Sequence, residues 1–478
     1  MKKKKILIFC YRFYDFRLWL MTGLLGALAQ KHDVSILCPA NLTDTLKNHL
    51  GENVTILSYQ DNEVDFASKI REKIHGFCVH IFSMTYASKG THVNRSAAFH
   101  RGAFIKKARE QGIKVALPRF IIVWLSQAAS LLPPLRMFIA WIYKLTNPEN
   151  PFGRILRDIK PDLAIAATFG QEQDGVFLLE ARENDIRTLV AIQSWDKTSS
   201  KGYPFLFSDH MIVWNEPSRQ EAIDFLGFPA TCVWAEGSPV WDNFFSKDYI
   251  FTQQQLFEKI GLKTDNKTVF VALNSWSYHE GNKNLVALLA DSLKNQKFDV
   301  PVQILIRQHP SYDGEQSKKD DLEKFIAPFR SVPGLHFSKP ETMYQEQNFL
   351  YHESDSRLQA SCFAHCDVTL SSVSTFMIES AIFDRPAINI EYGRWVNDTY
   401  DFDISEYKAE HILRIYDYGA TYRAFNPDQL IKFINHALKN PDEKRSERAH
   451  LVEQEAGINK GASGQAYLRR INTLLDVQ

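Results

Sequence analysis

The feature that most constrains the fold is an alternation of short apolar runs with stretches of helical periodicity. In the first half of the chain, the stretch at 18–30 has apolar residues at helical spacing, and it lies between two apolar runs. Short apolar runs separated by helices predict parallel strands joined by crossover helices. The predicted strands of this half are 6–10, 33–38, 54–57, 79–82, 114–117, 163–166, 188–192, 211–213 and 231–234. They are enough for one complete α/β domain.

The pattern restarts after a polar segment at 246–268. Beyond it, strands are predicted at 269–273, 302–306, 335–337, 368–370 and 387–390, with helices at 284–293, 321–329 and 375–383. A chain of 478 residues is longer than one hydrophobic core usually supports. We therefore expect two Rossmann-like, doubly wound α/β domains facing a central cleft, at 1–248 and 249–465, and a last helix at 466–478 that crosses back to the first domain.

The composition indicates which kinds of partner the protein binds and in which compartment it is found. Lys plus Arg equals Asp plus Glu at 56 each, so there is no overall positive charge to attract nucleic acid. The six cysteines are scattered, which is typical of buried thiols in a reducing compartment. The start resembles a signal peptide, with Lys2 to Lys5 before an apolar run, but Arg12, Asp15 and Arg17 interrupt that run early. We interpret it as a first strand and expect a cytoplasmic protein.

The segment 120–145 is unusually apolar, with Arg136 its only charged residue before Lys144. Pro133 and Pro134 in its middle argue against a simple membrane span, because proline removes a backbone donor and kinks a helix. Two interpretations remain open. The segment forms two core or interfacial helices, or it attaches the protein peripherally to the inner face of a membrane.

The strongest motif is Asp367-Val-Thr-Leu-Ser-Ser-Val-Ser-Thr-Phe-Met-Ile-Glu379. A strand ends near Leu370, a hydroxyl-rich turn follows, and a helix begins. Capping requires one hydroxyl, whereas this turn has four: Ser371, Ser372, Ser374 and Thr375. Hydroxyls beside the free N–H groups of a helix N-terminus favour a phosphate ligand. Glu379 lies about one turn further on, where a carboxylate can accept hydrogen bonds from ribose hydroxyls.

A second motif lies where the strand at 302–306 runs into Arg307, His309 and Pro310. Proline restricts the preceding residue to extended conformations, so His309 is expected to point out of the sheet. A histidinium there could pair with a leaving phosphate or act as its general acid. Arg307, at the end of the same strand, is a candidate donor-binding residue. The alternatives are a structural histidine and, for Arg307, an ordinary surface charge.

The loop 274–280 follows the first strand of the second domain and contains Ser275 and His279. Small side chains and backbone N–H groups in such a loop suit a leaving-group phosphate, so Ser275 is a candidate donor ligand. His279 is equally interpretable as a second electrophile or as a surface residue.

On the acceptor side, sugar transfer needs a base to deprotonate the incoming hydroxyl. Four carboxylates follow predicted strands of the first half: Asp15, Glu172, Asp174 and Asp196. Acidic residues in loops are common, and most are simply solvated. We take Asp15, Glu172 and Asp174 as the catalytic candidates, together with His309 of the second half.

Together, these motifs resemble those of a known enzyme superfamily. Gln308-His309-Pro310 after a strand, then Ser371-Ser372-x-Ser374-Thr375-x-x-x-Glu379-x-Ala381 after another, resemble the second domain of GT-B glycosyltransferases. Among them, the pattern is most similar to bacterial surface-polysaccharide enzymes with HP and serine-rich motifs. These include CMP-sugar transferases of the sialic acid and Kdo types and the CDP-glycerol glycerophosphotransferases of teichoic acid synthesis.

The resemblance implies that His309 and the serines contact the donor phosphate and that Glu379 holds the ribose. It also implies independence of metals and no cofactor beyond the nucleotide-sugar substrate. The sialyl-type enzymes have an acidic-acidic-Gly motif that holds the base, and Gln173-Asp174-Gly175 departs from it by a glutamine.

The leading hypothesis is a glycosyltransferase. We expect inverting transfer from a CMP- or UDP-type donor to a cell-surface glycan or lipid-linked acceptor. The alternatives are a non-hydrolysing sugar-nucleotide epimerase, a CDP-glycerol-type polyol-phosphate transferase, and a scaffold subunit whose site has decayed. Released nucleotide would distinguish a transferase from an epimerase, and nucleotide binding would argue against the scaffold.

Overall fold

The structure is a computed structural model of the chain. It describes residues 3–51, 53–60, 69–85, 101–102, 104–106, 109, 112–147, 150–200, 208–345, 348–372, 374–392, 394–396, 399–401 and 409–476. The chain divides into two compact units. Unit 1 contains Met1–Val240, Ala409–His411 and Gly457–Gln478, and unit 2 contains Trp241–Lys408 and Ile412–Ala456.

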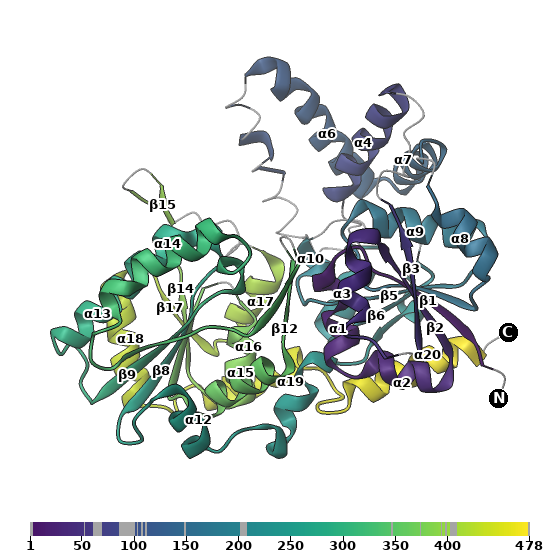
Figure 1. The fold of residues 1–478 in the computed structure, drawn as a ribbon. Coiled ribbons are helices and arrows are strands. Elements are labelled where there is room, and N and C mark those ends of the chain that lie inside the picture. The colour runs from purple at the N-terminus through teal and green to yellow at the C-terminus, as the bar shows by residue number, and fades with distance from the viewer. Residues whose placement is uncertain are drawn as a thin grey trace. The chain divides into compact units, whose positions relative to one another are not determined.

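Unit 1 is built on a parallel sheet, which has seven strands among the described residues, in the order β3-β2-β1-β4-β5-β6-β7 (Figure 1). The strands are β1 (Lys5–Phe9), β2 (Asp33–Pro39), β3 (Val54–Tyr59), β4 (Leu163–Ala166), β5 (Thr188–Ala191), β6 (His210–Val213) and β7 (Val233–Ala235). β4 and β5 are buried along their whole length, as expected for parallel strands covered on both faces. The strand order reverses between β1 and β4, which makes this edge a topological switch point.

All but the last of the helices described in unit 1 lie between these strands in the chain. The helices are α1 (Arg17–Met21), α2 (Leu24–Lys31), α3 (Thr43–Lys47), α4 (Lys69–Ser83), α6 (Ile113–Leu131), α7 (Pro133–Leu145), α8 (Phe152–Ile159), α9 (Glu172–Glu183), α10 (Lys197–Ser200), α11 (Glu216–Asp224) and α20 (Ser463–Asp476). The single helix predicted at 18–30 is two helices, because Gly23 adopts a left-handed conformation with φ of 69° and separates α1 from α2.

Two strand predictions in this unit were wrong. The runs 79–82 and 114–117 lie inside α4 and α6. In α4 the buried residues Cys78, Ile81 and Phe82 share one helical face. A short apolar run has the same composition in a buried helix as in a strand, so its length and periodicity alone did not distinguish the two.

The C-terminal segment belongs to unit 1 through close backbone packing. A Cβ on Gly457 would lie 2.5 Å from the carbonyl oxygen of Trp214 and 2.9 Å from Cα of Gly237, so only glycine fits there. The following helix, α20, packs against α2. Arg470 of α20 pairs with Glu236 at 2.6 Å.

Unit 2 is a second parallel sheet, with six strands among the described residues, in the order β10-β9-β8-β13-β14-β17. They are β8 (Lys267–Ala272), β9 (Val302–Arg307), β10 (Leu335–Ser338), β13 (Val368–Ser371), β14 (Ala387–Ile390) and β17 (Thr421–Ala424). In the described part of the unit, two antiparallel pairs accompany it: β11 (Thr342–Gln345) with β12 (Asn348–Tyr351), and β15 (Arg394–Val396) with β16 (Thr399–Asp401). Here the order reverses between β8 and β13.

The helices of unit 2 are α12 (Gln253–Ile260), α13 (His279–Lys294), α14 (Gln316–Ile326), α15 (Glu353–His365), α16 (Phe376–Ile382), α18 (Pro427–Lys439) and α19 (Arg445–Glu455). α17 (Glu410–Asp417) begins in the short segment assigned to unit 1 and continues in unit 2. The two α/β units, each with the strand order of a doubly wound fold, confirm the predicted Rossmann-like architecture.

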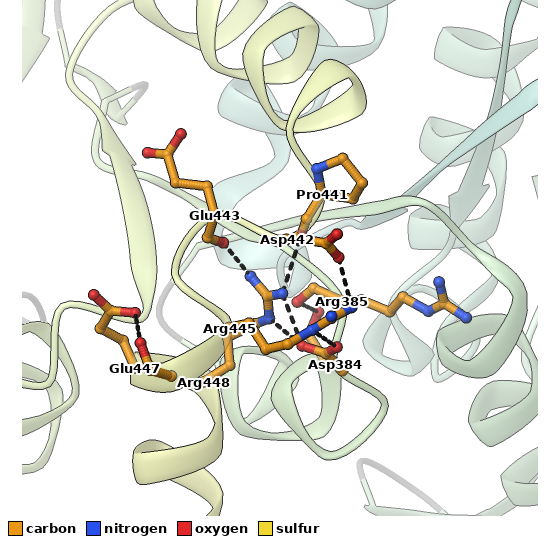
Figure 2. Close-up of polar contacts among 10 residues, drawn as sticks. Asp384, Arg385, Pro441, Asp442, Glu443, Arg445, Glu447 and Arg448 are labelled. Carbon is orange, nitrogen blue, oxygen red and sulfur yellow. Dashed lines mark hydrogen bonds and ion pairs between the residues drawn. The ribbon is translucent and has the colours of Figure 1, made fainter.

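A buried arginine fixes α19 to the turn after α16. The side chain of Arg448 is almost fully buried, and its guanidinium donates to Asp384 at 2.8 Å and to the backbone carbonyls of Glu443 and Pro441 at 2.7 and 2.8 Å. Arg445 also donates to Asp384, at 2.7 Å. Figure 2 shows both arginines converging on Asp384. This network holds the turn between α16 and β14. It therefore also supports the turn at the other end of α16 that contains Ser371, Ser372, Ser374 and Thr375, here called the serine turn.

Candidate active site

In unit 2, the residues predicted to bind a donor gather at the switch point between β8 and β13. Asn274 follows β8 and Ser372 follows β13, and the Asn274 side chain donates to Ser372 Oγ at 2.9 Å. Ser371 is buried, while Ser372, Ser374 and Thr375 are half-buried. Ligands of open α/β sheets bind at such switch points, so the serine turn occupies the position where this fold places them.

Hydrogen bonds tie the loop after β9 to the loop after β8. Ser311 Oγ accepts from the backbone N–H of Trp276 at 2.8 Å and lies 2.8 Å from Nδ1 of His309. Asn282 donates to the hydroxyl of Tyr312 at 2.9 Å and to the backbone carbonyl of Asn274 at 3.0 Å. The loops after β8, β9 and β13 therefore form one connected edge of unit 2.

Glu379 is more constrained than the motif suggested. It is buried on α16, and its carboxylate accepts from Thr375 Oγ1 at 3.1 Å, Trp241 Nε1 at 3.3 Å and Gln359 Nε2 at 3.0 Å. These donors fix the carboxylate, and Thr375 directs its hydroxyl along the helix toward Glu379. The ribose contact of Glu379 stays a prediction, and its position beside the serine turn is what supports it.

His309 differs from the expected histidinium. Burial lowers its pKa to about 4, so the imidazole is neutral near pH 7. Nδ1 accepts from the backbone N–H of Ser311 at 3.1 Å, which assigns the proton to Nε2. His309 is thus suited to act as a neutral hydrogen-bond donor toward a phosphate oxygen, whereas a cationic role would require protonation against its environment.

Arg307 forms an internal ion pair. Its guanidinium is buried and lies 2.5 Å from the buried carboxylate of Asp355, at the start of α15. Asp355 also accepts from the backbone N–H of Glu341 at 2.9 Å. A guanidinium held in this way has a structural role, which the sequence could not show because Asp355 lies 48 residues away.

Ser275 and His279, the two candidates in the loop after β8, lie close to the same edge of unit 2. Ser275 is half-buried and precedes the short helical turn Trp276–Tyr278. His279 begins α13, and its Nδ1 lies 3.2 Å from the hydroxyl of Tyr312. Burial lowers the pKa of His279, so it too favours the neutral form.

In unit 1, Asp15 and Asp174 lie at the other switch point. Asp15 follows β1 and Asp174 follows β4, the two strands between which the order reverses. Both side chains are buried, at 3% and 2% exposure. One oxygen of Asp15, Oδ2, is buried without a hydrogen-bond partner among the described residues. A buried carboxylate oxygen with an unused lone pair is a feature of sites that bind a ligand or a proton.

The two carboxyls influence each other. Burial, followed by the nearby charge of Asp15, raises the pKa of Asp174 to about 8. Burial also raises the pKa of Asp15, while Lys197, Gln193 and Arg12 oppose that rise. Asp174 also has a structural role, because its carboxylate accepts from the backbone N–H of Gln171 at 3.1 Å in the capping box of α9.

Three residues of this cluster were missed by sequence reasoning. Lys197 is buried at the start of α10, and its Nζ donates to the carbonyl of Phe169 at 2.8 Å. Gln193 follows β5, and Arg12 donates to Gln171 at 2.5 Å. Gln193 and Lys197 flank Asp196, so the available signal was the cluster of polar residues after β5.

Two other carboxylates lie outside this pair. Glu172 is half-exposed at the start of α9, and its Oε1 lies 2.9 Å from Nε2 of the buried His75 on α4. Asp196 accepts from Ser200 Oγ at 3.2 Å. The structure therefore brings Asp15 and Asp174 together with Lys197 and directs Glu172 toward α4.

The described residues contain no cluster of His, Cys, Asp and Glu that could hold a metal ion. The sequence has an Asp-x-Asp spacing at Asp401 and Asp403, of which Asp403 lies outside the described residues. Metal independence stays a prediction.

Comparison with known proteins supports the fold. No protein-family model matches the chain, and no curated protein matches it in sequence. Solved structures do resemble it over nearly the whole length. A UDP-GlcNAc 2-epimerase from Neisseria meningitidis bound to UDP-GlcNAc has a TM-score of 0.54 at 13% identity, covering 98% of this chain and 100% of its own.

Two further structures give the same result. A glycosyltransferase from Rickettsia africae has a TM-score of 0.52 at 11% identity, covering 100% of both chains. A UDP-GlcNAc 2-epimerase from Methanocaldococcus jannaschii has a TM-score of 0.51 at 13% identity, covering 98% of this chain and 99% of its own. At these identities the similarity establishes the fold, which is of the GT-B type. It does not single out the CMP-sugar or CDP-glycerol enzymes as nearest relatives.

Proposed function

We propose that this chain is an enzyme that acts on a nucleotide-activated sugar. The observation that carries the proposal is the serine turn of unit 2, which follows β13 at the switch point and is joined to the loops after β8 and β9. Its hydroxyls and the neutral His309 supply hydrogen-bond donors for phosphate oxygens. α16 has only seven residues, so we assign phosphate binding to these donors and to backbone N–H groups more than to a helix dipole.

Unit 1 supplies proton-transfer chemistry. Burial raises the pKa of both carboxyls, and Asp174, with a pKa of about 8, holds a proton at neutral pH. At Asp15 the nearby Lys197 and the hydrogen bond from Gln193 oppose the rise, whereas at Asp174 the charge of Asp15 adds to it. Two adjacent carboxyls whose surroundings differ in charge can provide both a base and an acid. We therefore assign the base to Asp15 and a proton-donating or hydrogen-bonding role to Asp174.

Two reactions fit this arrangement. Epimerisation of a sugar nucleotide requires proton removal and return at the sugar, which a base and an acid in one unit can supply. Two of the three solved structures described above are UDP-GlcNAc 2-epimerases, so epimerisation is the better supported reaction. Transfer of the sugar to a cell-surface glycan or lipid-linked acceptor needs only the base, and the Rickettsia glycosyltransferase supports it.

A thermal-shift panel tests the binding step. We expect UDP, CDP, CMP or GDP to raise the melting temperature of the wild type, and Ser372→Ala combined with Ser374→Ala to abolish that increase. The matched control is Ser317→Ala with Ser446→Ala, two exposed serines of unit 2, which should retain it. An unchanged shift in the Ser372 and Ser374 variant would contradict the assignment of the phosphate site.

Product analysis separates the reactions. A transferase liberates the free nucleotide when donor and acceptor are present, whereas an epimerase returns an intact sugar nucleotide with an altered sugar. In the epimerase case, reaction in deuterium oxide should place deuterium on the sugar ring. A wild type that binds no nucleotide in the panel would favour a scaffold.

A further inference from the structure

The outer face of α6 and α7 is apolar and exposed. Among the described residues, fifteen large hydrophobic side chains are exposed, and ten of them lie between Leu117 and Leu145. On α6 they include Leu117, Phe120 and Trp124. On α7 they include Met137 and Trp141. Isolated exposed apolar side chains are normal, but a concentration of this kind marks an interaction site.

Helical spacing places these residues on one side of each helix. Leu117, Phe120 and Trp124 follow an i, i+3, i+7 pattern, and the opposite side of α6 is buried at Ile122 and Val123. Similarly, Trp141 and Leu145 are four residues apart on α7, while Ile139 and Tyr143 are buried. α6 and α7 pack against each other and against α4, and Figure 1 shows the three grouped beyond the sheet of unit 1. Each helix is therefore anchored on one side and apolar on the other.

All the charged residues of α6 and α7 are basic. Residues 113–145 contain four basic side chains, Lys114, Arg119, Arg136 and Lys144, and no acidic one. Apolar surface combined with basic residues and tryptophan is the composition of helices that lie in the interface of an anionic membrane. A protein partner with an acidic rim would also complement this charge, but the surplus of basic residues beside a continuous apolar face favours an anionic membrane surface.

A pocket lies beside this face. It has a volume of about 700 Å³, and Trp141, Lys144 and Leu145 of α7 line it together with Arg71, Arg154 and Arg157. Glu180 and Glu183 also line it, leaving an excess of two positive charges. Glu180 accepts from the side chains of Asn147 and Asn150 at 3.0 and 3.1 Å, and Glu183 pairs with Lys144 at 2.6 Å. Arg154 and Arg157 are exposed, so they can reach a phosphate next to the apolar face.

We propose that the outer face of α6 and α7 docks on an anionic phospholipid bilayer and that the pocket beside α7 receives a lipid phosphate. The apolar side chains enter the interface, and the basic residues contact the headgroups. None of the helices among the described residues is long and apolar enough to cross a bilayer. The inference is independent of the reaction that the chain catalyses.

Vesicle flotation of the full chain tests the proposal. We expect the wild type to float with vesicles of phosphatidylcholine mixed with phosphatidylglycerol and to bind pure phosphatidylcholine more weakly. Trp124→Ser with Trp141→Ser should lower the partition coefficient on both by about tenfold or more, since each indole buries a large apolar area. Arg154→Gln with Arg157→Gln should lower binding only to the anionic vesicles, by about fivefold for each arginine.

The control is Ile458→Ser, an exposed apolar residue of unit 1 that lies outside α6 and α7, and it should bind as the wild type does. Because all substituted side chains are exposed, the variants should keep the wild-type melting temperature. Quenching of wild-type tryptophan fluorescence by brominated lipid provides a second measurement. The proposal is overturned if the wild type does not float, if the tryptophan variant floats equally well, or if the wild type is a dimer that the tryptophan substitutions dissociate.

Discussion

Replacement of Asp174 by asparagine should stabilise unit 1 and impair turnover. The carboxamide is nearly isosteric with the carboxyl, and its oxygen can still accept from the backbone N–H of Gln171. Unlike the carboxyl, it cannot ionise. The effect on stability follows from the pKa of Asp174, which burial raises from its ordinary 3.8 to about 8.

The magnitude depends on pH. Between pH 4 and pH 8 the unfolded chain has an ionised Asp174, whereas the folded chain keeps it protonated, so folding takes up a proton. Wild-type stability therefore falls as pH rises, by about 1.4 kcal/mol per pH unit in this window. At pH 7 the accumulated difference is on the order of 4 kcal/mol in favour of the asparagine variant. Below pH 4 both states are protonated and the difference vanishes.

Thermal melting from pH 4.5 to 8 measures this difference. The gap between variant and wild type should widen with pH, at roughly 2–4 °C for each kcal/mol. Asp158→Asn, at an exposed carboxylate of α8, serves as the control and should show no widening. A constant gap for Asp174→Asn would refute the reasoning, because it would mean that Asp174 keeps its charge in the folded chain.

Three further predictions concern unit 2. Arg307→Met should lower the free energy of unfolding of this unit by about 3–5 kcal/mol, measured by urea denaturation, because it leaves Asp355 buried without its cation; a change below about 1 kcal/mol would argue against the buried pair. Arg448→Met should cost about 2–3 kcal/mol in the same assay, since two backbone carbonyls and Asp384 lose their donor. For His309, whose pKa burial lowers to about 4, stability should fall as pH decreases from 6.5 to 4, by up to about 3 kcal/mol, and His309→Gln should remove that slope. Nucleotide binding by the wild type should accordingly show no protonation step of this histidine between about pH 5.5 and 8, and a step near pH 6.5 that His309→Gln removes would contradict the neutral form.

The architecture could be predicted because buried parallel strands leave a local signature. Apolar runs such as 163–166 and 302–306 became strands, and the restart after 246–268 indicated a second sheet. The runs 79–82 and 114–117 did not become strands, because residues buried in a helix have the same local composition as residues of a buried strand. Whether such a run forms a helix or a strand depends on the surface that it packs against, and a single sequence does not contain that information.

The residues of the candidate site could be predicted where they follow a strand directly, but the roles that depend on distant residues could not. Residues directly after strands, such as Asp15 and Ser372, were found because the carboxyl ends of parallel strands define the ligand edge. The roles of other site residues depend on partners that are distant in sequence. Asp355 gives Arg307 a structural role, and Lys197 joins the carboxyl pair only through the packing of α10.

The most direct test of activity on a nucleotide sugar is NMR analysis of the full chain incubated with UDP-GlcNAc and a panel of other nucleotide sugars, with and without lipid-linked acceptors. We expect at least one donor to be converted, either to an epimeric sugar nucleotide or to free nucleotide and glycosylated acceptor. Asp15→Asn should abolish that conversion while leaving nucleotide binding intact. A wild type that binds no nucleotide and converts no donor would contradict the proposed activity on a nucleotide-activated sugar.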